Sequence, residues 1–245
     1  MTERDSVKAK EKPRLVGVIT SRDELRIAAR LRKPPDFLEL RLAHFVDVAS
    51  DVENMIPRLP SPLIITVRDF REGGAKQLSL RERRDLFLRF LPHATFVDIE
   101  LRSLHTLASI FETAHQRKVQ RILSVHDFRS TPGLRTMLAK AREAKSAGAE
   151  VFKIVTRVDT AHQLARLDEF MESRPPGIKV SAMGIGKLGV ASRIVLSRLG
   201  SVMAYANLSK TTLEGQPSLS QIRRLLEATS AQRNFAHPPV SAVRI

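Results

Sequence analysis

A single lysine interrupts an apolar run whose composition is typical of a buried β-strand. The run covers residues 150–155, with the sequence E-V-F-K-I-V, and Lys153 is its only internal charge. Burial among apolar side chains disfavours an ammonium and leaves more of a lysine as the free amine, which attacks carbonyls and forms Schiff bases. Taken alone, the run is better explained by a lysine whose ammonium reaches water past the end of the strand.

Other side chains that could do chemistry gather near the ends of the remaining apolar runs. If these runs are parallel strands of a barrel, their C-terminal ends meet at one rim, where barrel enzymes carry their active sites. A histidine beside the amine would supply the proton shuttle that imine chemistry needs. The side chains are Glu39, Arg41, Arg68, Glu72, Asp98, Glu100, His126, Asp127, Arg193, Tyr205 and Asn207.

Several of these residues also have a purely structural explanation. Glu39 and Arg41 are two residues apart on one strand, so they share a face and could form a salt bridge. His126 and Asp127 could cap the following helix, and Asp98 could orient a neighbouring cation. The functional interpretation depends on the whole set, because all of these groups converge on one end of the expected strands together with a buried lysine.

The elements that must position these residues follow from an alternation of short apolar runs and longer amphipathic segments. Eight strands are expected, at residues 15–19, 37–41, 63–67, 95–100, 121–125, 151–155, 178–183 and 202–206. Helices are expected after the capping sequences at Ser21 and Ser79, and over residues 51–58, 103–118, 131–147, 159–172, 188–199 and 218–228. About eight such units in this length predict an α/β fold with one domain, a (β/α)8 TIM barrel. The alternative is an open, doubly wound parallel sheet.

The two ends of the chain differ from this body. Residues 1–13 are charged and lack the apolar segment of a signal peptide, so a disordered leader is expected there. The barrel and its catalytic domain are expected over residues 14–229, and a C-terminal tail over residues 230–245. No apolar run reaches the ~18 residues of a membrane span.

The net charge of +15, from 41 basic and 26 acidic residues, favours anionic partners. The sequence contains no RNP, zinc-finger or KH motif and no tryptophan, and aromatic residues make up only 5% of the chain. Basic residues such as Arg81, Arg83, Arg84 and Arg89 are spread over many helices, which indicates a solvated basic surface or the steering of a small anion. The chain has no cysteine, which excludes disulfides and thiol chemistry and is compatible with the cytoplasm.

A glycine-rich segment, G-I-G-K-L-G at residues 184–189, matches the G-x-G-x-x-G pattern of dinucleotide-binding domains. That pattern requires an acidic residue about 20 positions further on. Ser209 and Lys210 stand there instead, so a dinucleotide site is not expected. A glycine loop that leads into a helix could still bind a smaller anion through its backbone N–H groups.

Taken in order, the polar motifs resemble those of the type I 3-dehydroquinate dehydratases, the Schiff-base enzymes of the shikimate pathway. The similarity covers residues 14–228. Each motif is weak alone, but their order and their barrel-compatible positions make the set specific. The matching motifs are E-L-R at 39–41, T-V-R-D-F-R-E-G-G at 66–74, S-V-H-D-F at 124–128, F-K-I at 152–154, G-K-L-G-V-A-S-R at 186–193 and G-Q at 215–216.

The resemblance implies a lyase that converts 3-dehydroquinate to 3-dehydroshikimate and water, a step of chorismate and aromatic amino acid biosynthesis. Lys153 would form the imine with the substrate ketone. His126 would remove the C2 proton and return a proton to the departing C1 hydroxyl, and Glu72 would orient His126. The resemblance implies no metal and no organic cofactor, and because the family is commonly dimeric it implies a homodimer.

The same resemblance implies a set of substrate-binding residues. Arg193 would pair with the substrate carboxylate, which suits a planar, bidentate guanidinium. Substrate hydroxyls would be bound by residues of the second and third strands, which would also hold a charge network. Two further substrate-binding residues would come from a lid loop after the eighth strand. These remaining residues are Glu39, Arg41, Arg68, Thr212 and Gln216.

Parts of the sequence depart from the family pattern. The lid reads T-L-E-G-Q at residues 212–216, where S-A-P-G-Q is usual, so the missing proline could loosen it and Glu214 could weaken anion binding. Ile185 stands where methionine is usual, and Tyr205 where phenylalanine is usual. These two are changes in the pocket wall, which are expected to tune affinity.

Two other functions fit parts of the sequence. Another Schiff-base barrel lyase, of aldolase type, would share Lys153, but the set of His126, Glu72 and Arg193 argues against it. A basic protein that binds polyanions or nucleic acids would fit the net charge and would bind with a strong dependence on salt. We expect a small anionic substrate instead, with no nucleic acid or membrane as partner.

Overall fold

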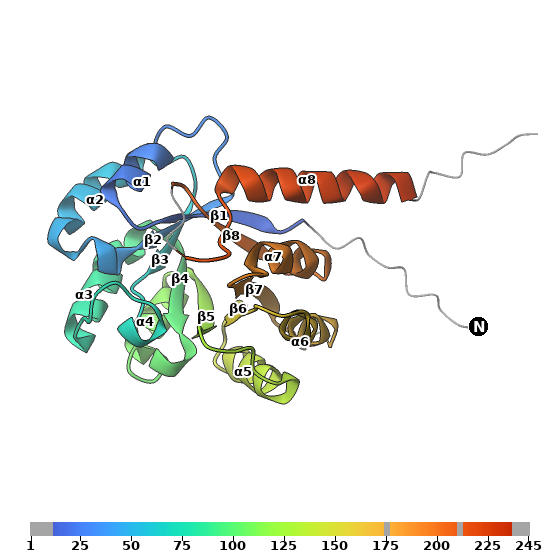
Figure 1. The fold of residues 1–245 in the computed structure, drawn as a ribbon. Coiled ribbons are helices and arrows are strands. Elements are labelled where there is room, and N and C mark those ends of the chain that lie inside the picture. The colour runs from blue at the N-terminus through green and yellow to red at the C-terminus, as the bar shows by residue number, and fades with distance from the viewer. Residues whose placement is uncertain (1–11, 174–176, 210–212, 237–245) are drawn as a thin grey trace, which may run out of the picture.

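Eight parallel strands form a nearly closed barrel at the centre of the computed structural model, which describes residues 12–173, 177–209 and 213–236 (Figure 1). The order is β7-β6-β5-β4-β3-β2-β1-β8, and every hydrogen-bonded pair of neighbours is parallel. The expected single-domain barrel is therefore confirmed. The strands are β1 (Arg14–Ile19), β2 (Phe37–Arg41), β3 (Leu63–Thr66), β4 (Ala94–Glu100), β5 (Gln120–Asp127), β6 (Val151–Arg157), β7 (Lys179–Ile185) and β8 (Met203–Asn207).

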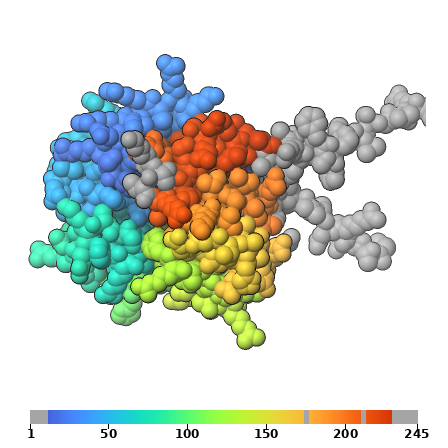
Figure 2. All heavy atoms as spheres, in the orientation of Figure 1, coloured from blue at the N-terminus to red at the C-terminus, as the bar shows by residue number. Residues whose placement is uncertain are grey.

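The barrel closes where β7 meets β8, through a few separate hydrogen bonds. The backbone N–H of Val202 donates to the carbonyl oxygen of Val180 over 2.9 Å, and the N–H of Ala182 donates to the hydroxyl of Ser201 over 3.0 Å. On its other side β8 pairs with β1, the first strand of the chain. Because β8 pairs with β1, the two ends of the described chain lie together. Figure 2 shows this on one face, where the red C-terminal segment lies against the blue N-terminal segment and the orange helix α7 (Gly189–Arg198).

Helices follow the strands and surround the barrel (Figure 1). Two of the expected helix starts are confirmed by their caps. The hydroxyl of Ser21 accepts from the N–H of Glu24, and Ser79 forms a capping box with Glu82. Besides α7, the α-helices of the described part are α1 (Arg22–Ala28), α2 (Ala49–Met55), α3 (Leu80–Phe90), α4 (Ala108–Gln116), α5 (Leu134–Ser146), α6 (Ala161–Glu172) and α8 (Leu219–Ala236).

Some boundaries differ from those expected. Helix α5 begins at Leu134, not at 131, because Pro132 disfavours helical backbone at the residue before it and Gly133 occupies the N-cap. Helix α8 continues to Ala236 and takes in the first residues of the expected tail. The rest of the tail and residues 1–11 of the expected leader lie outside the described residues. None of the described helices is long and apolar enough to cross a membrane.

The apolar core has two parts, one between the barrel and its helices and one inside the barrel. Inside, the lower layer is apolar and includes Phe96, Ile122 and Met203. Above it the inward positions of several strands become polar, and these side chains are almost completely buried: Glu39, Thr66, Asp98, Ser124, Lys153 and Ser181. The fold therefore places ionisable groups in the middle of the barrel, where water does not screen their interactions.

Candidate active site

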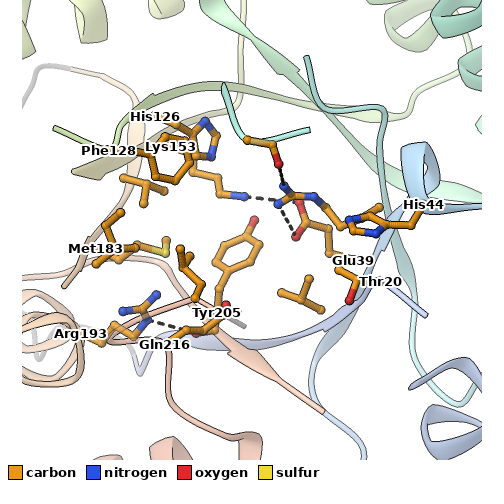
Figure 3. Close-up of a pocket in the computed structure, with 16 residues that line it drawn as sticks. Thr20, Glu39, His44, His126, Phe128, Lys153, Met183, Arg193, Tyr205 and Gln216 are labelled. Carbon is orange, nitrogen blue, oxygen red and sulfur yellow. Dashed lines mark hydrogen bonds and ion pairs between the residues drawn. The ribbon is translucent and has the colours of Figure 1, made fainter. Parts of the chain in front are cut away.

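A cavity of about 260 Å³ opens at the C-terminal end of the barrel (Figure 3). Six of the residues expected in the site line it, and they come from segments far apart along the chain: Glu39, Arg41, His126, Lys153, Arg193 and Gln216. Arg68 and Glu72 do not line it and act behind its wall. The lining residues are Val18, Thr20, Glu39, Arg41, His44, Gly73, His126, Phe128, Lys153, Val155, Met183, Ile185, Arg193, Tyr205, Leu213 and Gln216.

Lys153 lies inside the barrel and is only 2% exposed, so its ammonium does not reach past the end of the strand. Its Nζ atom lies 2.9 Å from Oδ2 of Asp98 and 3.5 Å from Oε1 of Glu39. It also lies 3.8 Å from the centre of the Tyr205 ring. The expectation of apolar neighbours is therefore wrong at the amine itself, where two carboxylates and an aromatic face lie against Nζ.

His126 is held from behind by Glu72, which comes from the short 3-10 helix η4 (Phe70–Glu72). Oε2 of Glu72 accepts from the backbone N–H of His126 and lies 3.0 Å from its Nδ1. Burial, followed by the positive charges of Arg68 and Lys153, lowers the pKa of His126 well below its ordinary value. Burial raises the pKa of Glu72 to about 7. The histidine is therefore neutral at pH 7, with Nδ1 engaged by Glu72 and Nε2 left to act as a base.

Arg68 is the centre of a buried charge network. Its guanidinium donates to Glu100 over 3.0 Å, to the hydroxyl of Ser124 over 2.6 Å and to Asp98 over 2.8 Å. Burial opposes the charge, but the carboxylates outweigh it and raise the pKa of Arg68. Burial likewise opposes ionisation of Asp98, yet Arg68 and Lys153 lower its pKa. Arg68 and Asp98 therefore remain ionised, and Arg68 connects the members of the network behind the cavity.

Glu39 and Arg41 line the cavity, and each carries a polar atom without a hydrogen-bond partner among the described residues. Oε1 of Glu39 accepts from the hydroxyl of Thr66 over 2.8 Å. Oε2 of Glu39 and Nε of Arg41 are buried and have no hydrogen-bond partner among the described residues, although Nη1 of Arg41 lies 3.7 Å from that oxygen. A ligand hydroxyl that donates to this oxygen would supply what the carboxylate lacks, because unsatisfied buried polar atoms are costly.

Arg193 is buried at the start of α7 and is bound by backbone carbonyls. It donates to the carbonyl oxygens of Tyr205, Gly184, Gly189 and Gly215. Burial lowers the pKa of Arg193 to about 10, and no carboxylate of the described residues forms an ion pair with it. An anion in the cavity would therefore meet a preformed cation that carries no counter-charge of its own.

The glycine-rich segment before α7 serves packing. The N–H of Gly186 donates to the carbonyl of Glu214, and that of Gly189 donates to the carbonyl of Gly186. The N–H groups of Lys187 and Leu188 also donate to protein acceptors, so the anion site considered for this loop is not formed. A Cβ added at Gly189 would lie 2.6 Å from the carbonyl oxygen of Gly215, so glycine is needed for this close approach.

The loop after β8 contributes Gln216 and Leu213 to the cavity wall, as expected for Gln216. Thr212 lies outside the described residues. Glu214 lies 3.2 Å from Nη2 of Arg157, which in turn binds Asp159 over 2.6 Å. The negative charge of Glu214 is thus paired at the surface, and the side chain is absent from the cavity lining.

Two features of the site were missed or misjudged in the sequence. Asp98 was expected to orient cations, and the sequence contains no signal that its partner would be Lys153. Arg83 was assigned to the solvated surface, but the structure buries it to 5% exposure, with a contact of 2.6 Å to Glu100. Its position on the inner face of α3 beside buried Phe87 was the available signal. Ile185 and Tyr205 line the cavity, as expected for wall residues.

Comparisons with known proteins place these observations in a family. Residues 16–233 match the family model described as Type I 3-dehydroquinase. The chain is 32% identical to the 3-dehydroquinate dehydratase of Thermococcus gammatolerans, over 86% of this chain and 97% of that one. It is 28% identical to the enzyme of that name from Thermococcus onnurineus, over 89% of this chain and 100% of that one.

Comparison with solved structures gives the same family as the sequence comparison. The 3-dehydroquinate dehydratase of Geobacillus kaustophilus superposes with a TM-score of 0.80 at 25% identity, covering 90% of this chain and 92% of that one. The fold is also that of the type I enzyme from Clostridium difficile, solved with covalently modified comenic acid. That superposition has a TM-score of 0.82 at 20% identity and covers 91% of this chain and 95% of that one.

Proposed function

The chain belongs to the type I 3-dehydroquinase family and is a 3-dehydroquinate dehydratase of the shikimate pathway, and we propose that it acts through an imine at Lys153. The observation that carries this proposal is the buried amine with Asp98 on one side and the open cavity on the other. His126 and Arg193 line the same cavity, so a base and an anion anchor are available to one bound molecule.

The proposed reaction proceeds through two iminium ions. The Lys153 amine adds to the C3 carbonyl, and the carbinolamine takes up a proton and loses water to give the first iminium. His126 takes the C2 proton, which leaves an enamine, and the enamine expels the C1 hydroxyl. That hydroxyl takes the proton from His126 and departs as water. A water molecule then hydrolyses the second iminium, which releases 3-dehydroshikimate, the free amine and the proton that was taken up in the first step.

The two carboxylates beside Nζ suit this sequence of steps. An ammonium and an iminium place a positive charge on the same nitrogen, so Asp98 and Glu39 stabilise both. The low pKa of Asp98 keeps its charge throughout. We propose that this fixed negative charge favours iminium formation, since preorganised charges stabilise a developing charge without reorganisation.

Substrate binding is assigned to the groups around this centre. Arg193 would bind the substrate carboxylate, because burial leaves it a cation without an acidic partner. Glu39 and Arg41 would bind substrate hydroxyls through the two polar atoms that lack partners. Gln216 and Thr212 would contribute from the loop after β8. Arg68 and Glu72 would act indirectly, through Asp98 and His126.

The test is chemical trapping of the imine. The protein is incubated with 3-dehydroquinate and borohydride, and the reduced adduct is located by peptide mass spectrometry. The adduct is expected on Lys153, and Lys153→Ala is expected to abolish both the adduct and turnover. An exposed lysine of α5 provides the matched control, so Lys145→Ala should behave like the unaltered protein. Modification elsewhere with Lys153 untouched would refute the mechanism.

A second variant separates imine formation from proton transfer. His126→Ala should lower kcat by about 10²- to 10⁴-fold, because it removes the base, yet it should still allow some adduct at Lys153. His162→Ala, an exposed position on α6, is the control. Unchanged turnover in His126→Ala would mean that another group takes the C2 proton.

We further propose that the protein is a cytoplasmic homodimer that binds neither nucleic acid nor membrane and needs no metal or organic cofactor. Light scattering on the purified protein tests the dimer, and cell fractionation tests the location. A gel shift at low salt tests binding to DNA or RNA, because any affinity that arises from the net charge of +15 is greatest at low salt. Activity that is lost in chelator would contradict the absence of a metal.

A further inference from the structure

We propose that Arg83 is a positioning residue for the dehydration, which holds Arg68 in place and through it sets Asp98 against the amine of Lys153. The proposal rests on the assignment of Lys153 as the imine-forming residue. Arg83 belongs to helix α3 and is absent from the cavity lining, yet an unbroken line of buried ion pairs joins it to the amine.

The guanidinium of Arg83 binds four different groups, one of which is the hydroxyl of Ser103, 3.2 Å from Nη1. Its Nη2 donates to Oε2 of Glu100 over 2.6 Å, and its Nη1 lies 3.2 Å from Oδ2 of Asp69. Its Nε and Nη2 both donate to the carbonyl oxygen of Val67, over 3.1 and 2.9 Å. Arg83 therefore holds the backbone of Val67 and the side chain of Asp69, the residues on either side of Arg68, and also Glu100, the last residue of β4.

Glu100 connects Arg83 to Arg68, because each of its two carboxylate oxygens binds one of these guanidiniums. While its Oε2 atom binds Arg83, its Oε1 atom accepts from Nη1 of Arg68 over 3.0 Å and from the N–H of Asp69 over 2.9 Å. One carboxylate is thus shared by two guanidiniums. Because Glu100 is completely buried, both cations are needed to hold it in one orientation.

The line ends at the reacting amine. Nη2 of Arg68 donates to Oδ2 of Asp98 over 2.8 Å, and the same oxygen accepts from Nζ of Lys153 over 2.9 Å. Arg68 and Lys153 therefore compete for one oxygen atom. A shift of Arg68 toward Glu100 would change both the direction and the strength of the contact that Asp98 makes with the amine.

Loss of Arg83 would cause such a shift. Glu100 would keep only one cation, and the uncompensated half of its charge would draw Arg68 away from Asp98. The substrate-binding groups Arg193 and Arg41 would stay in place, because neither forms a hydrogen bond or ion pair with Arg83 or Arg68, and Glu39 meets Arg68 only at 3.9 Å. The geometry therefore assigns Arg83 an effect on the chemical step, with little effect on substrate binding.

The experiment compares Arg83→Ala, Arg83→Lys and a control at the next residue of α3, Arg84→Ala, which is exposed. Arg83→Ala should lower kcat and the rate of borohydride-trapped adduct formation by about 10- to 100-fold, since small misplacements of catalytic groups have effects of that size. KM should change by less than about threefold. The kcat of Arg83→Lys should lie between those of Arg83→Ala and the unaltered protein, because an ammonium keeps the positive charge but cannot donate in several fixed directions as a planar guanidinium does.

Chemical rescue and a double variant exclude a merely structural role. Guanidinium chloride at non-denaturing concentrations should restore part of kcat in Arg83→Ala, whereas potassium chloride at equal ionic strength should not. In Arg83→Ala/Glu100→Gln the unpaired charge is removed, so thermal stability should recover while kcat stays low.

Two results would overturn the proposal: a wild-type kcat in folded Arg83→Ala, or recovery of both stability and kcat in the double variant. If the unaltered protein itself gave no adduct at Lys153, the mechanism proposed above would fail first, and the behaviour of Arg83 would not be the cause.

Discussion

The Oε2 atom of Glu72 lies 3.0 Å from Nδ1 of His126 and 3.0 Å from the backbone nitrogen of the same residue. One carboxylate oxygen thus fixes both the main chain and the ring of the histidine, over a separation of 54 residues. With Nδ1 engaged, Nε2 is the nitrogen that can take a proton from a molecule in the cavity.

This pairing predicts an inflection near pH 7. Because the pKa of Glu72 is about 7, the carboxylate takes up a proton as the pH falls through that value and no longer accepts the N–H of Nδ1. The depressed pKa of His126 keeps the ring itself neutral over the same range. A pH profile of kcat/KM should therefore rise through about pH 7.

Glu72→Gln tests the origin of that inflection. The amide cannot titrate, so the variant should lose the inflection, and kcat/KM on the alkaline side should be about 10- to 100-fold lower. Persistence of the same inflection in Glu72→Gln would assign it to a different group.

Asp98→Asn should reduce both activity and stability. The amide keeps the size of the side chain but removes the charge that faces Lys153 and Arg68, which leaves two buried cations undercompensated. A loss of about 3–5 kcal/mol in the free energy of unfolding is expected, as for other broken buried ion pairs. Urea denaturation measures it, with exposed Asp85→Asn as the control. A stability equal to that of the control would show that the network does not depend on this carboxylate.

Arg193→Lys should weaken substrate binding. A lysine cannot reproduce the guanidinium that four backbone carbonyls hold in place, and it presents a point charge to the substrate carboxylate. KM should rise by about 10- to 100-fold, the range expected for the loss of a charged hydrogen bond. Steady-state kinetics with Arg198→Lys, an exposed position of the same helix, provide the comparison. An unchanged KM would place the carboxylate elsewhere.

Glu214→Ala should not improve binding, contrary to what the sequence suggested. Glu214 is paired with Arg157 and holds the segment that carries Leu213 and Gln216 against the cavity. KM should rise modestly, by up to about fivefold, because exposed pairs contribute little. Arg157→Met should have a similar effect, and the double variant should add nothing further. A lower KM in Glu214→Ala would mean that its charge repels the substrate after all.

The elements themselves were readable from local patterns. A strand needs only a short apolar run and a helix only its periodicity and caps, so β2 was expected with its observed bounds and Ser79 was recognised as a cap. The observed helix bounds differ from the expected ones in two cases. Helix α5 begins later because the effect of Pro132 was overlooked, and α8 ends later because its helical pattern continues past residue 228.

The sequence by itself also determined which residue types are present at the barrel's C-terminal end, because Lys153 and His126 lie on parallel strands that run toward it and Arg193 follows a third such strand, whatever the details of packing. Which atoms meet was decided only by the tertiary structure. Asp98 contacts Lys153 from β4 to β6, and Arg83 reaches Glu100 from a helix, through pairings separated by many residues. Such contacts depend on the register of the strands and on the direction of side chains across the barrel. The spacing of residues along the sequence does not determine either of these. That is why a lysine expected among apolar groups lies between two carboxylates, and why an arginine expected at the surface is buried.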